Sequence, residues 1–362
     1  MLRAEDVILI LNWESNYQNL ANNIAKKSLE IIYIPLVKLE RRFGMDRKRL
    51  VAVFLCLLIM SMMTACGGNN KPAAEENPEV QQSAEEEQPA AFTGDLIISA
   101  EDAVALIGSD DVIFVDCTGE ADKGTVKGAV ATTWQDMCTC SEEYGSAGDD
   151  TWGKIPEPAD LSARLGALGL DKNKQIITLG HTLKGWGEDA RLAWELRAAG
   201  YENVRIVNGG IDALYDAGAE KQSAASDPVP CEVTVDDLDK THVMETSELA
   251  ANFDQYKIVD VRTDDEYNGA TKYGEAKGGH IKGAVFVPYL DLFREDGTLK
   301  TNDEITAMFE AQGVNKTDKV VAYCTGGIRS AYVQMVLEMC GYDTTFNYDQ
   351  SYWNWCVENE VE

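Results

Sequence analysis

The sequence predicts an α/β fold of two tandem domains, each a mainly parallel sheet flanked by helices. Two halves align at an offset of 144 residues, because Gly169–Leu179 matches Gly313–Tyr323 and Val115 falls on Val259. Within each half a short apolar strand is followed by a loop, a helix and another strand, an order typical of parallel sheets. The length of 362 residues suits two domains after subtraction of a targeting segment.

The ends of the two halves also correspond. Gly200-Tyr201 and Gly341-Tyr342 each end an expected helix and lead into expected strands over residues 204–207 and 344–348. The chain is therefore divided into an upstream stretch, a signal, a tether, a first domain, a linker and a second domain. The upstream stretch covers residues 1–44, the signal 45–65 and the tether 66–92. The first domain covers residues 93–222, the linker 223–242 and the second domain 243–362.

The N-terminal region has the pattern of a secretory signal. A basic stretch, Met45–Arg49, precedes the apolar run Leu50–Met63, which is shorter than the about 20 residues that span a bilayer. The ending Thr64-Ala65-Cys66 resembles a bacterial lipobox, which implies lipidation of Cys66 and an extracytoplasmic, membrane-anchored protein. The polar residues 67–89 are expected to form a flexible tether. A core helix around residues 51–60 is the alternative.

Residues 1–44 do not fit this pattern, because signals lie at the start of a chain. We expect Met45 to be the initiator, with the upstream stretch a start-site artefact or a disordered extension. The sequence does not decide whether it is translated.

The formal net charge is -29. Nucleic acid and anionic lipid surfaces are bound through clustered Lys and Arg, so this charge argues against both as partners. An anionic small molecule would have to be attracted by local groups, such as Arg329 and backbone N–H groups.

Cys324 is the candidate nucleophile. The apolar strand 320–323 leads into Cys324-Thr325-Gly326-Gly327-Ile328-Arg329 and then into a helix. A glycine turn at a helix start directs several N–H groups and a positive dipole end into one concavity, which favours a thiolate. The alternative is a buried packing cysteine.

The other cysteines give no metal site. Seven of the nine follow Cys66, and this odd number leaves at least one thiol unpaired in an exported protein. Cys138 and Cys140 have no second pair, and the chain holds three histidines, so no zinc set is expected. Cys340 is expected in the core. The disulfide pairing is left open.

The spacing from Cys324 to Arg329 is Cys-(x)4-Arg, one residue shorter than the Cys-(x)5-Arg loop of cysteine-based phosphatases. This loop resembles the six-residue active-site loop of the rhodanese family of sulfurtransferases. The segments Ile258–Arg262, Gly278–Ala284 and Asp296–Lys300 resemble the two-domain thiosulfate and 3-mercaptopyruvate sulfurtransferases. The resemblance covers residues 94–358, and the lipobox indicates a lipoprotein form.

The resemblance implies that the Cys324 thiolate takes a sulfur atom as a persulfide and passes it to a thiol, cyanide or protein acceptor. The N–H groups of Thr325, Gly326, Gly327, Ile328 and Arg329 would stabilise the persulfide, with no metal or organic cofactor. Asp260 and Arg262 are expected to support the site. Arg262 is expected to form an ion pair within its domain, and the alternative is that it lines the pocket. His280 is expected to order a turn.

Glu266 departs from the family, whose members often have an arginine there. Its carboxylate would repel an anionic donor unless Arg329 compensates or the side chain turns away. The donor, thiosulfate or 3-mercaptopyruvate or another compound, is therefore left open, as are the acceptor and the oligomeric state.

The first domain is expected to be catalytically inactive and structural or regulatory. Cys324 aligns with Gly180, and Thr118 stands where the second domain has Arg262. His181 and Lys184 either line a cleft or belong to a solvated loop. Two other functions stay open for the whole chain: a surface-anchored binding or sulfur-delivery module without turnover, and a phosphatase or arsenate reductase on the same fold.

Overall fold

The computed structural model describes residues 91–362, which belong to one compact unit. The upstream stretch 1–44, the signal 45–65, the lipidation site Cys66 and nearly all of the tether lie outside the described residues. No helix within residues 91–362 is long and apolar enough to cross a membrane.

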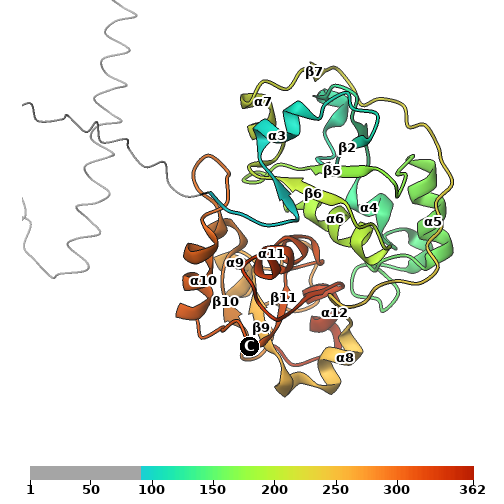
Figure 1. Ribbon diagram of the computed structural model, residues 1–362. Helices are drawn as coiled ribbons and strands as arrows, with labels where there is room; N and C mark the ends of the chain where they lie inside the picture. Colours follow the sequence, from blue (N-terminus) through green and yellow to red (C-terminus); the bar gives the residue numbers. More distant parts are fainter. Residues whose placement is uncertain (1–90) are drawn as a thin grey trace, which may run out of the picture. The chain divides into compact units, whose positions relative to one another are not determined.

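The first domain is a five-stranded parallel sheet with helices on both faces (Figure 1). The strand order is β1-β6-β5-β2-β4, and a short antiparallel pair, β3 and β7, lies outside this sheet. The strands are β1 (Ile97–Ile98), β2 (Val112–Asp116), β3 (Thr125–Val126), β4 (Val130–Ala131), β5 (Gln175–Leu179), β6 (Val204–Val207) and β7 (Lys221–Gln222). The helices are α3 (Ala100–Ala105), α4 (Trp134–Met137), α5 (Pro158–Ala167), α6 (Glu188–Ala198) and α7 (Gly210–Asp216).

The second domain repeats this arrangement with the order β10-β9-β11-β12-β8, again entirely parallel. Its strands are β8 (Val243–Met244), β9 (Lys257–Asp260), β10 (Val285–Phe286), β11 (Lys319–Tyr323) and β12 (Thr344–Tyr348). Its helices are α8 (Thr246–Ala251), α9 (Asp264–Tyr267), α10 (Asn302–Ala311), α11 (Ile328–Met339) and α12 (Ser351–Glu358). The predicted fold class is confirmed, and the strands expected at 204–207 and 344–348 are β6 and β12.

Strand residues alternate between two cores because successive side chains point to opposite faces of a sheet. In β2, Phe114 packs in the core beneath α3 and α7, whereas the next residue, Val115, packs in the core beneath α5 and α6. In β11, Val321 faces α8 and α12, and Val320 faces α10 and α11. Burial on both faces explains why these strands are continuous apolar runs.

The two domains meet through corresponding helices, since α6 of the first packs against α11 of the second. The side chains under both helices form one continuous buried cluster that includes residues from both sheets. At the edge of this contact Arg197 donates two hydrogen bonds to Glu338, at 2.9 and 2.7 Å. The helix that begins at the Cys324 loop is therefore held by both domains.

Candidate active site

Cys324 lies at the carboxyl end of β11, a central strand, and immediately before α11. Gly327 caps the helix with a φ of 83°, a left-handed conformation that glycine adopts without strain. A Cβ at Gly327 would overlap the backbone oxygen of Asp349. The structure places Cys324 and the predicted loop residues 325–329 together, all of them buried.

The environment of Cys324 favours the thiolate. Burial by itself raises the pKa of this thiol, but the positive charge of Arg329 and hydrogen bonds from Ser330 and the Gly326 N–H outweigh it. The pKa of Cys324 therefore lies below its ordinary value. The Ser330 hydroxyl lies 3.6 Å from the sulfur, within hydrogen-bond reach. These are the conditions that a sulfur nucleophile needs near neutral pH.

The start of α12 holds the loop from the other side. The Cys324 N–H donates to the Ser351 hydroxyl at 3.1 Å, and that hydroxyl donates to the Tyr348 carbonyl at 2.7 Å. Ser351 has a φ of 54°, the one positive value among the non-glycine residues of the described chain. Such a conformation costs of the order of 1–3 kcal/mol and persists where surrounding contacts fix it. Ser351 is thus a positioning residue for Cys324.

Arg329 and Glu266 form a buried ion pair beneath the loop. The guanidinium donates to the two carboxylate oxygens at 2.9 and 2.7 Å, and the Thr325 hydroxyl donates to the same carboxylate at 2.7 Å. Burial alone raises the pKa of Glu266, but these bonds and the charge of Arg329 hold it well below its usual range. Both charges are therefore present and largely cancel each other. Of the two ways in which Glu266 could avoid repelling a donor, the structure shows compensation by Arg329.

Asp260 and Arg262 form a second buried ion pair, with contacts of 2.7 to 3.1 Å. Asp260 also accepts a hydrogen bond from the Tyr323 hydroxyl at 2.5 Å. Since Tyr323 directly precedes Cys324, this pair fixes the end of β11. Arg262 additionally borders a hollow next to the Cys324 pocket.

His280 lies away from the nucleophile. Its ring stacks on Tyr267 with centroids 3.8 Å apart, and its Nδ1 lies 3.1 Å from the Tyr267 carbonyl oxygen. It is not among the residues that line the Cys324 pocket.

The pocket above Cys324 has aromatic walls from both domains. It has a volume of about 60 Å³ and is lined by Cys324, Thr325, Gly326, Ile328 and Arg329, together with Trp134, Trp186, Tyr273 and Trp353. Trp353 covers Gly326 so closely that any side chain at Gly326 would overlap the indole ring. Trp134 and Trp186 belong to the first domain, so the pocket is not complete in the second domain alone.

The first domain also positions the loop through Arg191 of α6. This buried side chain donates to the Gly327 carbonyl at 3.3 Å and to Glu195 at 2.7 Å, and it pairs with Asp349 at 2.6 Å. Asn347 donates to the same Gly327 carbonyl at 3.1 Å.

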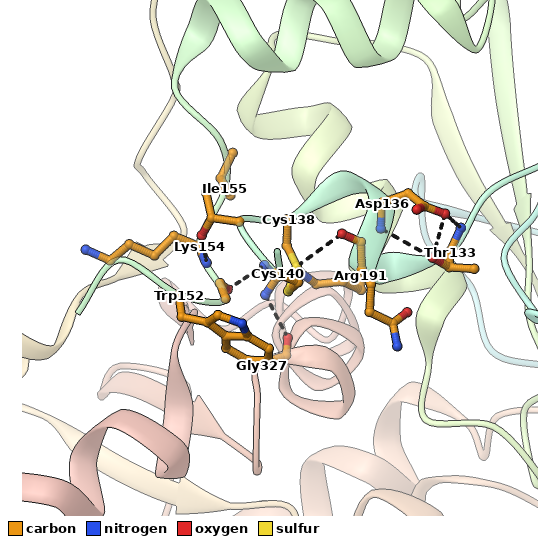
Figure 2. Close-up of a disulfide and its surroundings, with 12 residues drawn as sticks. Thr133, Asp136, Cys138, Cys140, Trp152, Lys154, Ile155, Arg191 and Gly327 are labelled. Carbon is orange, nitrogen blue, oxygen red and sulfur yellow. Dashed lines mark hydrogen bonds between the residues drawn. A yellow bond between two sulfur atoms is a disulfide. The ribbon is translucent and has the colours of Figure 1, made fainter. Parts of the chain in front are cut away.

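A disulfide joins Cys138 and Cys140 on the first-domain side of the site (Figure 2). Cys138 packs in one small cluster with Trp134, which lines the pocket, and with Ile328 of the loop. The free cysteines of the described chain are Cys117, Cys231, Cys324, Cys340 and Cys356. Cys340 is buried, and burial raises its pKa to about 11, opposite in direction to Cys324.

The corresponding position of the first domain is Gly180, which has no nucleophilic side chain. A Cβ at Gly180 would lie 2.7 Å from Cγ of Asp189, closer than side-chain carbons approach. The hollow at this end is lined by Thr118, Glu120, His181, Lys184, Gly185, Trp186 and Glu188, which include no thiol. His181 lies 3.1 Å from Asp212, and Lys184 lies 3.4 Å from it. Within residues 91–362 no cluster of His, Cys, Asp and Glu could hold a metal ion.

Sequence reasoning missed Ser351, Arg191 and the aromatic walls. Ser351 carries no local signal, because its φ and its partner are set by the packing of α12. Arg191 belongs to a domain with no nucleophile of its own. The aromatic run Tyr352-Trp353 was the one visible hint of a wall near the site.

The sequence profile of the rhodanese-like domain matches this chain twice, over residues 99–217 and 245–358. Bovine thiosulfate sulfurtransferase is 27% identical over 206 residues, which cover 56% of this chain and 69% of that protein. A putative thiosulfate sulfurtransferase of Haloferax volcanii is 25% identical over 287 residues, covering 73% and 94% respectively. The anaerobic ergothioneine biosynthesis enzyme from Chlorobium limicola, solved with trimethyl histidine, has a TM-score of 0.63 at 20% identity. That alignment covers 74% of this chain and 70% of the other, and it shows the shared fold.

Proposed function

The chain belongs to the rhodanese family of sulfurtransferases, and we propose that it moves a sulfane sulfur from a donor such as thiosulfate to a thiophilic acceptor through a persulfide on Cys324. The observation that carries this proposal is the Cys324 loop. It combines a thiol of lowered pKa, a ring of buried residues and an open pocket directly above the sulfur.

In the first step the Cys324 thiolate attacks the outer sulfur of the donor. A sulfur–sulfur bond forms to Cys324, the bond inside thiosulfate breaks, and sulfite leaves with the bonding electron pair. Arg329 and the hydrogen bonds from Gly326 and Ser330 stabilise negative charge on the cysteine sulfur. The persulfide keeps one negative charge, so the same groups hold the intermediate.

In the second step an acceptor thiolate or cyanide attacks the outer sulfur of the persulfide. The Cys324 thiolate then leaves and the enzyme returns to its starting state. Because the loop stabilises this leaving group, the same geometry serves both steps. No proton transfer through His280 is needed.

The proposal is tested with thiosulfate and cyanide, by measuring thiocyanate and the mass of Cys324 after donor alone. We expect thiocyanate formation and a gain of one sulfur atom on Cys324. Cys324→Ser should remove both and leave the fold intact. Retained activity in that variant would refute the site, and the absence of both signals with thiosulfate and with 3-mercaptopyruvate would refute the enzyme.

The binding or sulfur-delivery module without turnover is the other candidate function. Its support is Gly180, which stands in the first domain at the position that aligns with Cys324. A persulfide that forms on Cys324 but is not passed to any small acceptor would favour this module. The Cys-(x)4-Arg loop length argues against the phosphatase and arsenate reductase alternatives.

We further propose that the protein is exported and anchored to the bacterial cell membrane through lipid on Cys66. The support is the signal-like pattern of residues 45–65 followed by a polar tether. Metabolic labelling with a fatty acid should label the full chain at Cys66 and not label Cys66→Ala. Equal labelling of both would refute the anchor.

A further inference from the structure

The pocket over Cys324 has an unusual wall for a site that handles small anions. Its non-loop lining consists of four aromatic side chains, Trp134, Trp186, Tyr273 and Trp353. Trp186 and Tyr273 make an edge-to-face contact, with ring centroids 5.6 Å apart and planes at 78°. They are 41% and 38% exposed, so they stand at the mouth, where an incoming ligand meets them first.

The charges around the pocket also do not favour a small anion. The one charged side chain of its lining is Arg329, whose guanidinium is bound through two hydrogen bonds to the carboxylate of Glu266. An oxyanion in the pocket therefore relies on the loop N–H groups and on an Arg329 charge that Glu266 partly cancels. The floor holds the anionic sulfur of Cys324, and the chain as a whole carries a charge of -29.

Aromatic faces and negative charge together suit an organic cation. The ring quadrupole attracts an ammonium group, and tryptophan is the strongest of the three aromatic residues in this interaction. A quaternary ammonium is favoured over a small hydrated cation, because its methyl groups also gain from burial against the rings. The cavity above Cys324 is small, about 60 Å³, so it admits the thiol end of an acceptor and leaves a quaternary ammonium group at the mouth, against Trp186 and Tyr273.

We propose that this pocket selects sulfur acceptors that carry a quaternary ammonium group beside their thiol. This inference rests on the proposed function, because it names the acceptor of the Cys324 persulfide. The acceptor thiolate attacks the outer sulfur, a new sulfur–sulfur bond forms on the acceptor, and the Cys324 thiolate leaves. No oxidant or reductant is required. Trp186 is the specificity-determining residue contributed by the first domain.

The first test measures binding and does not depend on turnover. The full chain is titrated with choline and with the uncharged analogue in which carbon replaces the quaternary nitrogen, and binding is followed by calorimetry. We expect choline to bind at least about five-fold more tightly. Trp186→Leu should lose this preference. Leu183→Ala is the control, because Leu183 is on the same loop, is also 41% exposed and does not line the Cys324 pocket.

The second test measures transfer from the loaded persulfide to thiocholine and to its uncharged carbon analogue. The quaternary nitrogen also acidifies the thiol, so the preference of the wild type is divided by that of Trp186→Leu, which cancels intrinsic reactivity. We expect this ratio to be at least about five. The Cys324 persulfide is first quantified by mass in each protein, and each transfer rate is divided by the loaded fraction.

The outcomes separate the two proposals. Equal binding of choline and its analogue, or a transfer ratio of one with normal persulfide loading, would overturn the inference about the acceptor. A protein that never forms the persulfide would refute the proposed function, while its choline titration would still report on the pocket.

Discussion

The two domains have the same strand order, and the difference that concerns the nucleophile lies at the carboxyl end of one strand. In the second domain β11 leads into Cys324, with Arg329 in the first turn of α11. In the first domain β5 leads into Gly180, and the first turn of α6 carries Glu188 and Asp189 instead. Asp189 lies so close to Gly180 that a carboxylate occupies the space of the missing thiol.

This difference shows how a helix N-terminus can be used in two ways. The N–H groups and dipole of such a terminus stabilise negative charge. The first domain satisfies them with its own side chain, since Asp189 accepts from the Ala190 N–H at 2.9 Å. The second domain leaves them for the sulfur of Cys324. The first domain has no nucleophile at the position that corresponds to Cys324, but it supplies Arg191 and two aromatic walls to its neighbour.

The strongest test of this comparison replaces, one at a time, the two glycines that cap the paired helices. Gly327→Ala should lower persulfide formation by at least about 100-fold, because the new Cβ overlaps Asp349 and displaces loop N–H groups. Gly187→Ala is the matched control in the first domain, with a φ of 81° and its nearest neighbour at 3.2 Å. It should cost about 1–2 kcal/mol in the free energy of unfolding and little activity per folded molecule. Equal activity losses would contradict the assignment.

The two interdomain arginines of α6 give the next largest difference. Arg191→Met leaves the buried Glu195 and Asp349 without their partner and should cost about 3–5 kcal/mol in the free energy of unfolding. It should also slow persulfide formation per folded molecule, because Gly327 loses a donor. Arg197→Met removes a partly exposed ion pair with Glu338 and should lower the free energy of unfolding by at most about 1 kcal/mol. Urea titrations and donor-loading rates check both, with Arg191→Lys as a milder variant.

The two domains should also differ in how pH affects stability. Burial raises the pKa of Asp189 to about 7 from an ordinary 3.8. The protonated carboxyl of Asp189 therefore contributes fully to the free energy of unfolding below about pH 4. This contribution is lost as the pH rises through about 7. The pKa of Glu266 is instead held low by Arg329, so its contribution is lost as the pH falls below its ordinary 4.5.

Asp189→Asn should therefore flatten the decline in unfolding free energy between about pH 4 and 7, measured by urea titration at each pH. It should leave the loss in more acidic solution unchanged. An unaltered slope would show that Asp189 is not the group responsible.

A small effect is expected at the disulfide beside the site. Removing it with Cys138→Ser and Cys140→Ser should lower the free energy of unfolding by about 1–2 kcal/mol. The loss is small because the bond closes a very short loop. Cys231→Ser, a free and half-buried cysteine, is the control and should change the free energy of unfolding by less than about 0.5 kcal/mol. A double variant with a loss above that of Arg191→Met would show that the bond organises the whole domain contact.

Much of the fold could be predicted from local patterns. Apolar runs such as 320–323, bounded by turn residues, specify buried parallel strands, and the repeat specifies two copies. The Cys324 loop could also be predicted locally, because six consecutive residues form it and the glycine at 327 permits the left-handed turn. Glu266 was visible as a departure from the family, but only the placed side chains show that Arg329 compensates its charge.

The chain by itself determined which domain can carry a nucleophile, since no packing can turn Gly180 into a thiol. It also determined the loop that surrounds Cys324, because six consecutive residues form it. Tertiary structure decided the rest of the site. The pairing of Glu266 with Arg329, the bond from Ser351 to the Cys324 N–H and the reach of Arg191 across the domain contact join residues that are between 27 and 136 positions apart. Such contacts depend on how helices and sheets pack, and the free energy of that packing is shared by the whole core, so no local pattern records it.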